Sequence, residues 1–523
     1  MNRSITNRSD QHKRREERIR RRRAKIIKRL ERANRNKYRR AAELNGPVLN
    51  RNSPKYELCE KVRGTKHGGV AMILRLAEHT GLVHEIDRRV HVLKRHCPYQ
   101  ESDHVLNFAI NALCGGTCLE DIELRRNDEV FLDSLGVDAI PDPTTAGDFC
   151  RRFDEPTIRR LMDATNAARL NVWKQQPDEF FDEAIVDFDG VIVGTTGECK
   201  DGMDISYKGD WGYHPLLTSL ANTKEPLSIV NRSGNRPSEE DAWKEADAVV
   251  PALRRAGFRS IRFRGDSKFS QTEHLDRWNA GGVQFQFGYP DNSAVKSRAE
   301  DLPENAWTEL KRPARYAVKT QPRVRPENIK AKIVRQRAFL NLRLQSEQVA
   351  EFNYQPTACT KSYRMVVVRK NISREKGEEV LFDEIRYFFY ITNDRLTAVE
   401  DIVFGCNDRG DQENLIAQLA GGVRGLTAPV DNLVSNWAYM VMTSLAWSLK
   451  AWAALLQPVS PRWKEQHQAE QQTIMRMEFK QFIEHFVQVP CQIIRQGRRT
   501  IHRILNWNKW HAHFFRLSEV LQL

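Results

Sequence analysis

The chain has 523 residues, of which 40% are hydrophobic and 29% charged, with 11 Trp and 23 Phe. This composition excludes a wholly disordered protein, and the length favours three or four domains because a domain averages about 150 residues. The formal net charge is +15, and residues 1–40, with 18 basic and 4 acidic side chains, hold +14 of it. The rest of the chain is nearly neutral, so the basic character belongs to an N-terminal arm.

This arm is predicted to be a helix that binds nucleic acid. Residues 11–40 contain no Gly or Pro, and Ile19, Ile26 and Leu30 recur at helical spacing until Asn45-Gly46-Pro47 ends the pattern. Lys and Arg bind a polyanion by releasing its counterions. A localisation signal, a solvated tail and a contact with an acidic membrane are the other interpretations. The expected DNA-binding residues are Arg14, Arg15, Arg18, Arg20, Arg21, Arg22, Arg23, Lys25, Lys28 and Arg29.

The cysteines and the apolar stretches indicate the compartment. Nine Cys without a Cys-x-x-Cys pair, and no secretory signal, predict a reduced cytoplasmic protein. Cys114 and Cys118 have no partners for a zinc site and are interpreted as buried structural thiols. The stretch at 433–456 is long enough to span a bilayer, but Asn436 and Lys450 within it favour a buried helix and no membrane contact.

The order of predicted elements indicates an α/β fold. Residues 69–135 have a helical pattern, Thr144 or Thr145 is expected to cap the next helix, and residues 157–174 are helical. The β-branched run 184–193 then predicts a strand. Strands near 215–220 and 227–231, a helix at 238–256 and a strand at 260–264 follow. A ribonuclease-H-like fold would have this β-β-β-α-β order.

The second half of the chain is predicted to hold a β-rich insertion, with clear strands at 363–369 and 385–392. Helical pattern resumes from 396 to 457, and a basic helical tail contains Arg495, Arg498, Arg499 and Arg503. The predicted parts are a basic DNA-binding arm at 1–45, a helical DNA-binding or dimerisation domain at 46–178, a ribonuclease-H-like core at 179–290 and 396–460, the β-rich insertion at 291–395 between its two parts, and the tail at 461–523.

Acidic residues at strand ends are the candidate catalytic groups. Asp187 and Asp189 alternate on one strand, so both point to one face and require a cation or hydrogen-bond donors nearby. Mg²⁺ prefers such oxygen ligands. Asp266 comes directly after a second strand, although it could also be a turn residue that caps a helix. Arg409 and Glu413 share a helix face, where they could equally form an ordinary surface ion pair.

Several segments resemble the DDE transposases of bacterial insertion sequences, most closely the insertion-sequence family numbered thirteen-eighty. Asp189-Gly190 is similar to the acid of the family's first strand, and Arg264-Gly265-Asp266-Ser267 to its R-A-D-S motif. Arg409-x3-Glu413 is similar to the core of its Y-x2-R-x3-E-x6-K signature. Segments 142–153 and 212–217 resemble further family blocks. Cys406 stands where the signature has Tyr and Ala420 where it has Lys, so the phosphate contacts of those two positions are not expected.

The resemblance implies a ribonuclease-H-like core that cuts and rejoins DNA with two Mg²⁺ or Mn²⁺ ions. Asp189 would bridge both ions, Asp266 and Glu413 would hold one each, and Arg409 would neutralise a phosphate or orient Glu413. Asp187 is the alternative first acid. The implied partners are the terminal inverted repeats and target DNA, bound by a homodimer on the bacterial nucleoid. A DNA-binding protein without catalysis, such as a repressor or inactive transposase, and a plain metal-dependent nuclease are the alternatives.

Overall fold

The computed structural model describes residues 2–36, 56, 62–197, 199–312, 329–337, 340–376, 379–497 and 499–523, with the side chains of all but 2–12, 331, 335 and 379–381. The chain divides into two compact units. The first comprises Met1–Gln175, Gln418–Gly425 and Val441–Leu523, and the second comprises Gln176–Ala417 and Leu426–Met440. The predicted break at Asn45-Gly46-Pro47 lies outside the described residues. The six-part division of the chain stays a prediction.

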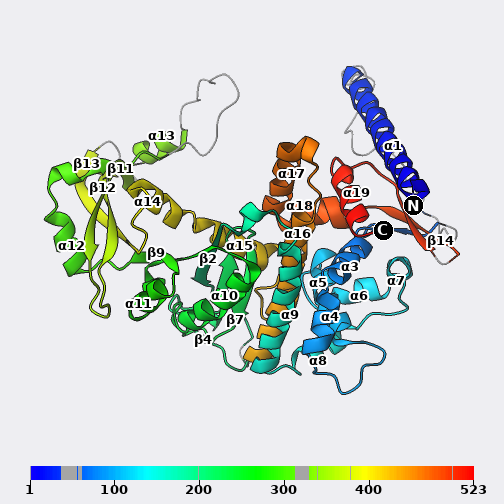
Figure 1. The fold of residues 1–523 in the computed structure, drawn as a ribbon, viewed down its shortest axis with the longest axis horizontal. Helices are drawn as coiled ribbons and strands as arrows, with labels where there is room; N and C mark the ends of the chain where they lie inside the picture. The colour runs from blue at the N-terminus through cyan, green and yellow to red at the C-terminus, as the bar shows by residue number, and fades with distance from the viewer. Residues whose placement is uncertain are drawn as a thin grey trace. The chain divides into compact units, whose positions relative to one another are not determined.

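The first unit is mainly helical (Figure 1). Up to residue 175 its helices are α1 (Asn2–Arg35), α3 (Val70–His79), α4 (Leu82–Arg89), α5 (Glu101–Leu113), α6 (Ile122–Arg126), α7 (Glu129–Leu135), α8 (Pro143–Cys150) and α9 (Glu155–Trp173). They match the helical pattern of residues 69–135 and 157–174. The cap of α8 differs from the prediction, because the side chain of Asp142, not of Thr144 or Thr145, accepts a hydrogen bond from the backbone N–H of Thr145.

The C-terminal part of the first unit contains a three-stranded sheet that the sequence pattern does not predict. The helices here are α17 (Lys464–Arg476), α18 (Phe479–Phe482) and α19 (His511–Val520), and the sheet has the order β1 (Gly64–Thr65), β14 (Cys491–Gln496) and β15 (Arg499–Ile504). The prediction of a helical tail is therefore wrong for Arg495, Arg499 and Arg503. Cys491 and Ile493 are buried while their neighbours are less so, which is the two-residue period of a strand.

Helix α16 (Leu433–Leu455) begins in the second unit and ends in the first. Lys450 is buried on it, donates a hydrogen bond to the carbonyl of Met475 at 2.8 Å and lies over the ring of Trp447. Among the described residues, no helix combines the length and apolarity needed to cross a membrane. The interpretation of both thiols as buried holds for Cys114 but not for Cys118, which is exposed.

The second unit is built on a nine-stranded mixed sheet. Its order is β10-β11-β12-β13-β9-β8-β2-β6-β7, in which β2 runs parallel to β8 and β8 parallel to β9, and the other pairs are antiparallel. The strands are β2 (Glu183–Gly190), β6 (Leu216–Leu220), β7 (Glu225–Val230), β8 (Ser260–Gly265), β9 (Gln284–Tyr289), β10 (Thr308–Glu309), β11 (Leu340–Tyr354), β12 (Tyr363–Lys376) and β13 (Glu379–Thr392). The predicted strands at 184–193, 215–220, 227–231 and 260–264 correspond to β2, β6, β7 and β8.

The strands of the predicted β-rich region continue this sheet, because β13 pairs with β9 (Figure 1). The sequence pattern indicates β12 and β13 but not β11, whose first seven residues are all exposed and show no alternation. The sheet packs on helix α14 (Val399–Asn407) through a core that includes Val349, Val366, Ile402 and Val403. This packing connects the long strands to the helical segment that follows them.

Shorter elements complete the second unit. Its other helices are α10 (Ala242–Ala256), α11 (Thr272–Ala280), α12 (Ser293–Glu300), α13 (Ile329–Gln336) and α15 (Gly410–Ala417). A separate small sheet has the order β3 (Val193–Gly194), β5 (Trp211–Tyr213) and β4 (Asp204–Ile205). It lies between β2 and β6 in the sequence.

Candidate active site

Strand β2 supplies two of the candidate carboxylates from the interior of the large sheet. It pairs with β6 on one side and with β8 on the other. The β-branched and aromatic residues from Ile185 to Phe188 favour a strand that is covered on both faces. Asp187 and Asp189 are therefore held on a rigid element, two positions apart.

Asp187 is a buried ion-pair partner. Its side chain is 1% exposed, and its two oxygens accept hydrogen bonds from Nε and Nη2 of Arg264 at 2.7 and 2.8 Å. Arg264 also donates to the carbonyl of Gly405 at 2.8 Å. Burial raises the pKa of Asp187, against the opposing effect of the Arg264 guanidinium. With both oxygens engaged by Arg264, Asp187 joins β2 to β8 and is not presented to a ligand.

Asp189 has a different environment at the end of the same strand. Its side chain is 18% exposed, and Oδ2 accepts a hydrogen bond from Nη1 of Arg409 at 3.0 Å. Burial raises the pKa of Asp189 to about 6, Arg409 opposes this shift, and the negative charge of Asp266 adds to it. Asp189 is thus a carboxylate whose charge is only partly compensated and which is still reachable from solvent.

Asp266 follows the last residue of β8, beside β2. Its Oδ1 accepts a hydrogen bond from the backbone N–H of Lys268 at 2.8 Å, so it caps the short 3-10 turn at Ser267–Ser270. Two glycines permit this loop. A Cβ on Gly265 would lie 2.6 Å from Cβ of Phe269, and one on Gly288 of β9 would lie 2.8 Å from the backbone nitrogen of Ser267. The absence of a side chain at Gly288 therefore lets the Asp266 loop pack against β9. The sequence does not reveal this role of Gly288, because it depends on a contact between segments that are distant in the chain.

Arg409 and Glu413 reach the site from the region of α15. Nη2 of Arg409 lies 3.6 Å from Oε1 of Glu413, which is the contact expected for residues four apart on a helix. The other terminal nitrogen of this guanidinium, Nη1, forms the ion pair with Asp189. Glu413 is 67% exposed, so it is free to change rotamer. Arg409 thus bridges two of the three predicted acids.

Gln412 is a positioning residue that the sequence pattern does not reveal. It is 2% exposed, and its Nε2 lies 3.0 Å from the carbonyl of Asp187 and 3.3 Å from that of Leu217. These two carbonyls belong to β2 and β6, so Gln412 connects α15 to two adjacent strands of the sheet. The sequence around Gln412 does not reveal this role, because the two carbonyl groups that Gln412 contacts are distant in the chain.

The donor set fits a hard divalent cation in kind. Asp189 and Asp266 offer carboxylate oxygens, and the pKa of Asp189 is raised mainly by burial and further by the charge of Asp266, which a bound cation would offset. Within the described part of the chain, no three His, Cys, Asp or Glu side chains are grouped closely enough to hold a metal ion. The guanidinium of Arg409 contacts both Asp189 and Glu413.

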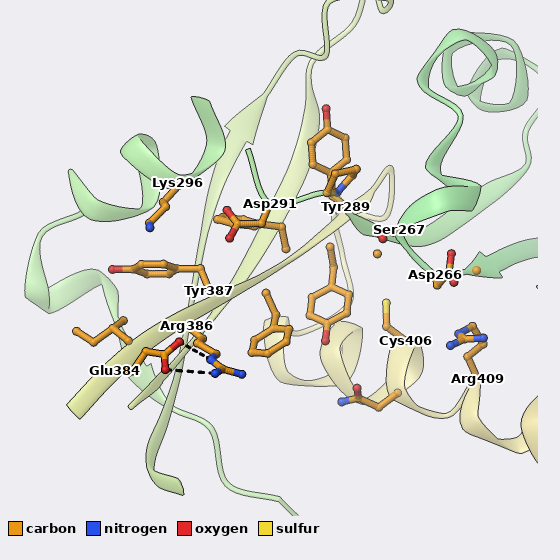
Figure 2. Close-up of a pocket in the computed structure, with 18 residues that line it drawn as sticks. Asp266, Ser267, Tyr289, Asp291, Lys296, Glu384, Arg386, Tyr387, Cys406 and Arg409 are labelled. Carbon is orange, nitrogen blue, oxygen red and sulfur yellow. Dashed lines mark hydrogen bonds and ion pairs between the residues drawn. The ribbon is translucent and has the colours of Figure 1, made fainter. Parts of the chain in front are cut away.

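A cavity of about 680 Å³ opens beside Asp266 and Arg409 (Figure 2). Tyr387 and Arg386 of β13 and Lys296 of α12 lie at its end away from those two residues. Cys406 lines it near Arg409, and burial raises the pKa of this thiol to about 12. The end of the cavity away from Asp266 and Arg409 therefore carries aromatic and basic side chains, and the acids Asp291 and Glu384 also line the cavity.

The predicted DNA-binding residues lie on α1 in the first unit, and all of them are exposed or half-buried. Arg15 lies over the ring of Phe515 at 5.2 Å and Arg23 over that of Trp507 at 5.8 Å. Arg22 is near the carbonyl of Ile504. These contacts attach one side of α1 to the C-terminal part of the unit and leave the other arginines in solvent.

Comparison with known proteins identifies the family. The model of the family "Transposase DDE domain group 1" matches residues 63–522. No curated protein matches the chain. A chain of a solved structure titled as a piggyBac transposase synaptic complex with hairpin DNA is 12% identical, with 80% of this chain and 87% of that chain covered and a TM-score of 0.33. At that score the likeness says nothing about function. The family match extends over most of the sequence, and the protein therefore belongs to the DDE transposase family.

Proposed function

We propose that this protein is an active DDE transposase that cuts the ends of an insertion sequence and joins them to target DNA. The observation that supports this best is the meeting of Asp189, Arg409 and Glu413 beside Asp266. Asp189 lies on β2, Asp266 directly after β8, Arg409 directly before α15 and Glu413 on α15, so the groups come from segments up to 224 residues apart in the sequence. In this function the protein acts in a bacterial cytoplasm and forms a homodimer on paired DNA ends.

The sheet supports a ribonuclease-H-like core. Strands β7, β6 and β2 are antiparallel neighbours, and β8 and β9 continue from β2 in parallel. We infer that these five strands are the core and that β10 to β13 are an extension of it. In this arrangement Asp189 and Asp266 end the adjacent strands β2 and β8, where catalytic side chains of open α/β sheets are commonly found.

We assign the cation ligands to Asp189, Asp266 and Glu413. Two Mg²⁺ or Mn²⁺ ions, when bound, supply an activated water or 3′-hydroxyl and stabilise the leaving oxygen of the phosphodiester. Asp189 has to be ionised for this, which its pKa of about 6 allows at neutral pH. Arg409 would leave Asp189 and neutralise a phosphate of the DNA, while Glu413 would turn toward the two aspartates. Asp187 takes no part, because Arg264 holds both of its oxygens.

The test is a cleavage and strand-transfer assay on labelled DNA that carries the terminal repeats found beside the gene. Asp189→Asn, Asp266→Asn and Glu413→Gln should each abolish Mg²⁺-dependent cleavage and leave DNA binding intact. Asp411→Asn is a matched control, because Asp411 is a 58% exposed acid on the same helix whose carboxylate pairs with Lys224 at 3.2 Å. That variant should cleave normally.

The assay also separates the alternatives. Cleavage without joining would indicate a plain nuclease. Binding to the ends without any cleavage by the unaltered protein would indicate a DNA-binding protein that lacks catalysis. Cleavage by the Glu413→Gln variant at the unaltered rate would remove Glu413 from the assigned ligands.

A further inference from the structure

The small sheet of the second unit ends in a well-defined hairpin between β4 and β5. Ser206 organises its tip, since its backbone N–H donates to the carbonyl of Asp210 at 2.8 Å and its Oγ lies 3.1 Å from the backbone nitrogen of Asp210. Gly209 has a φ of +88°, which a side chain would disfavour. The tip is thus held in one conformation by its own hydrogen bonds.

This hairpin exposes large apolar side chains. Tyr207 is 69% exposed, Trp211 53% and Ile205 47%. Ile205 and Trp211 are directly paired across the two strands, so they form one surface. Three large apolar side chains within seven positions form one exposed patch, and exposed patches of this kind often mark a binding surface.

Two lysines accompany the aromatic ring at the tip. The ammonium of Lys268 lies 4.9 Å from the ring centroid of Tyr207, and that of Lys208 lies 5.6 Å from it. Lys268 is two residues after Asp266, whose carboxylate accepts its backbone N–H. Both lysines are exposed. The ring therefore lies beside the loop that carries one of the candidate carboxylates.

Tyr207 is also close to the end of β2. Its ring centroid lies 6.3 Å from that of the buried His214. His214 packs against Gly190, where a Cβ would come within 2.7 Å of Nε2. Gly190 directly follows Asp189. The hairpin thus adjoins the backbone next to both aspartates of the site.

We propose that the β4–β5 hairpin binds the DNA strand next to the reacting phosphate, with an unpaired nucleobase stacked on Tyr207 and its phosphates at Lys208 and Lys268. This inference rests on the proposed function for its partner. An exposed aromatic ring with two ammonium groups over it can bind single-stranded nucleic acid, because a base that stacks on the ring can displace the ammonium groups toward its own phosphates. An apolar protein partner would have no use for the two ammonium groups.

The test compares two labelled strands of equal length, an oligothymidine and an abasic strand, by fluorescence anisotropy in EDTA so that no cleavage occurs. The unaltered protein should prefer the oligothymidine. Tyr207→Ala should weaken that binding about tenfold and leave abasic binding unchanged, because stacking of one base is lost. Tyr207→Phe should retain the preference. Phe382→Ala is a matched control, since Phe382 is likewise an exposed aromatic ring, 53% against 69% for Tyr207, and has the Arg374 guanidinium 5.3 Å from its ring.

The lysines have a separate readout. Lys208→Ala and Lys268→Ala should each reduce the slope of log K against log[salt] for the single strand by about 0.7. An unchanged preference for bases in Tyr207→Ala would overturn the proposal. So would a loss of dimer in light scattering by Tyr207→Ala with base preference retained, because the hairpin would then be a protein contact.

The binding test is independent of catalysis. Asp189→Asn should retain the base preference of the unaltered protein. If the unaltered protein fails to cleave end DNA while Tyr207→Ala still loses the preference, the proposed function is wrong and the hairpin assignment holds. If cleavage occurs and the preference is unaffected by Tyr207→Ala, only the hairpin assignment is wrong.

Discussion

Replacement of Asp189 by Asn should stabilise the protein, which is unusual for a residue assigned to catalysis. Burial and the charge of Asp266 raise the pKa of Asp189 from 3.8 to about 6, although Arg409 opposes them. The folded state therefore favours the neutral form of this side chain. Asparagine resembles that neutral form at every pH.

The pH dependence follows from the direction of the shift. The favourable contribution of protonated Asp189 is fully present below pH 3.8, is lost as the pH rises from 3.8 to about 6, and stays lost above that. The Asp189→Asn variant should therefore exceed the unaltered protein in free energy of unfolding by about 3 kcal/mol at pH 8 and by about half of that at pH 5. Below pH 3.8 the two proteins should be nearly equal.

The measurement is urea unfolding at pH 5 and pH 8, with hydrogen exchange of the β2 amides to identify the transition of the second unit. Mg²⁺ provides a second arm, because a cation at Asp189 compensates its charge. Mg²⁺ should stabilise the unaltered protein at pH 8, less so at pH 5, and should have little effect on Asp189→Asn. The reasoning fails if the variant is less stable than the unaltered protein at pH 8. It also fails if the two proteins differ in free energy of unfolding by the same amount at pH 5 and pH 8.

Three further predictions concern neighbouring features. Asp187→Asn should destabilise the protein by about 3–5 kcal/mol in the same urea experiment, because, unlike Asp189, Asp187 accepts with both oxygens from the buried Arg264, which the variant leaves without its counter-charge; a neutral effect would contradict the ion-pair role. Gln412→Leu should lower the free energy of unfolding by about 1–2 kcal/mol and slow cleavage at unchanged DNA affinity, since α15 loses two hydrogen bonds to the sheet; full activity would show that Gln412 does not position the helix. Deletion of residues 1–40 should make the slope of log K against log[salt] on duplex DNA less negative by about five, if the arm neutralises about six phosphates. An unchanged slope in binding titrations would mean that the arm contacts something else.

Local patterns in the sequence were sufficient for elements whose partners are close along the chain. The β-branched run of β2 and the helical pattern of residues 69–135 predicted their elements because each pattern has a short period. The same holds for Arg409 and Glu413, which meet because four residues make about one helical turn. The tail at Arg495 was predicted wrongly, since its basic side chains conceal the two-residue period of β14.

The choice between Asp187 and Asp189 could not be made from the strand alone, because alternation puts both on one face. The tertiary structure shows that parallel pairing of β2 and β8 sets Asp187 opposite Arg264, 77 residues later in the chain, and this contact supports the proposal of Asp189 as the first acid. Gln412 and Gly288 are likewise defined only by contacts with distant strands. The sequence by itself determined the charged arm, the central strands and the candidate acids. Which carboxylate is neutralised internally and which remains available was decided only by the fold, because long-range contacts set the burial and the counter-charge of each.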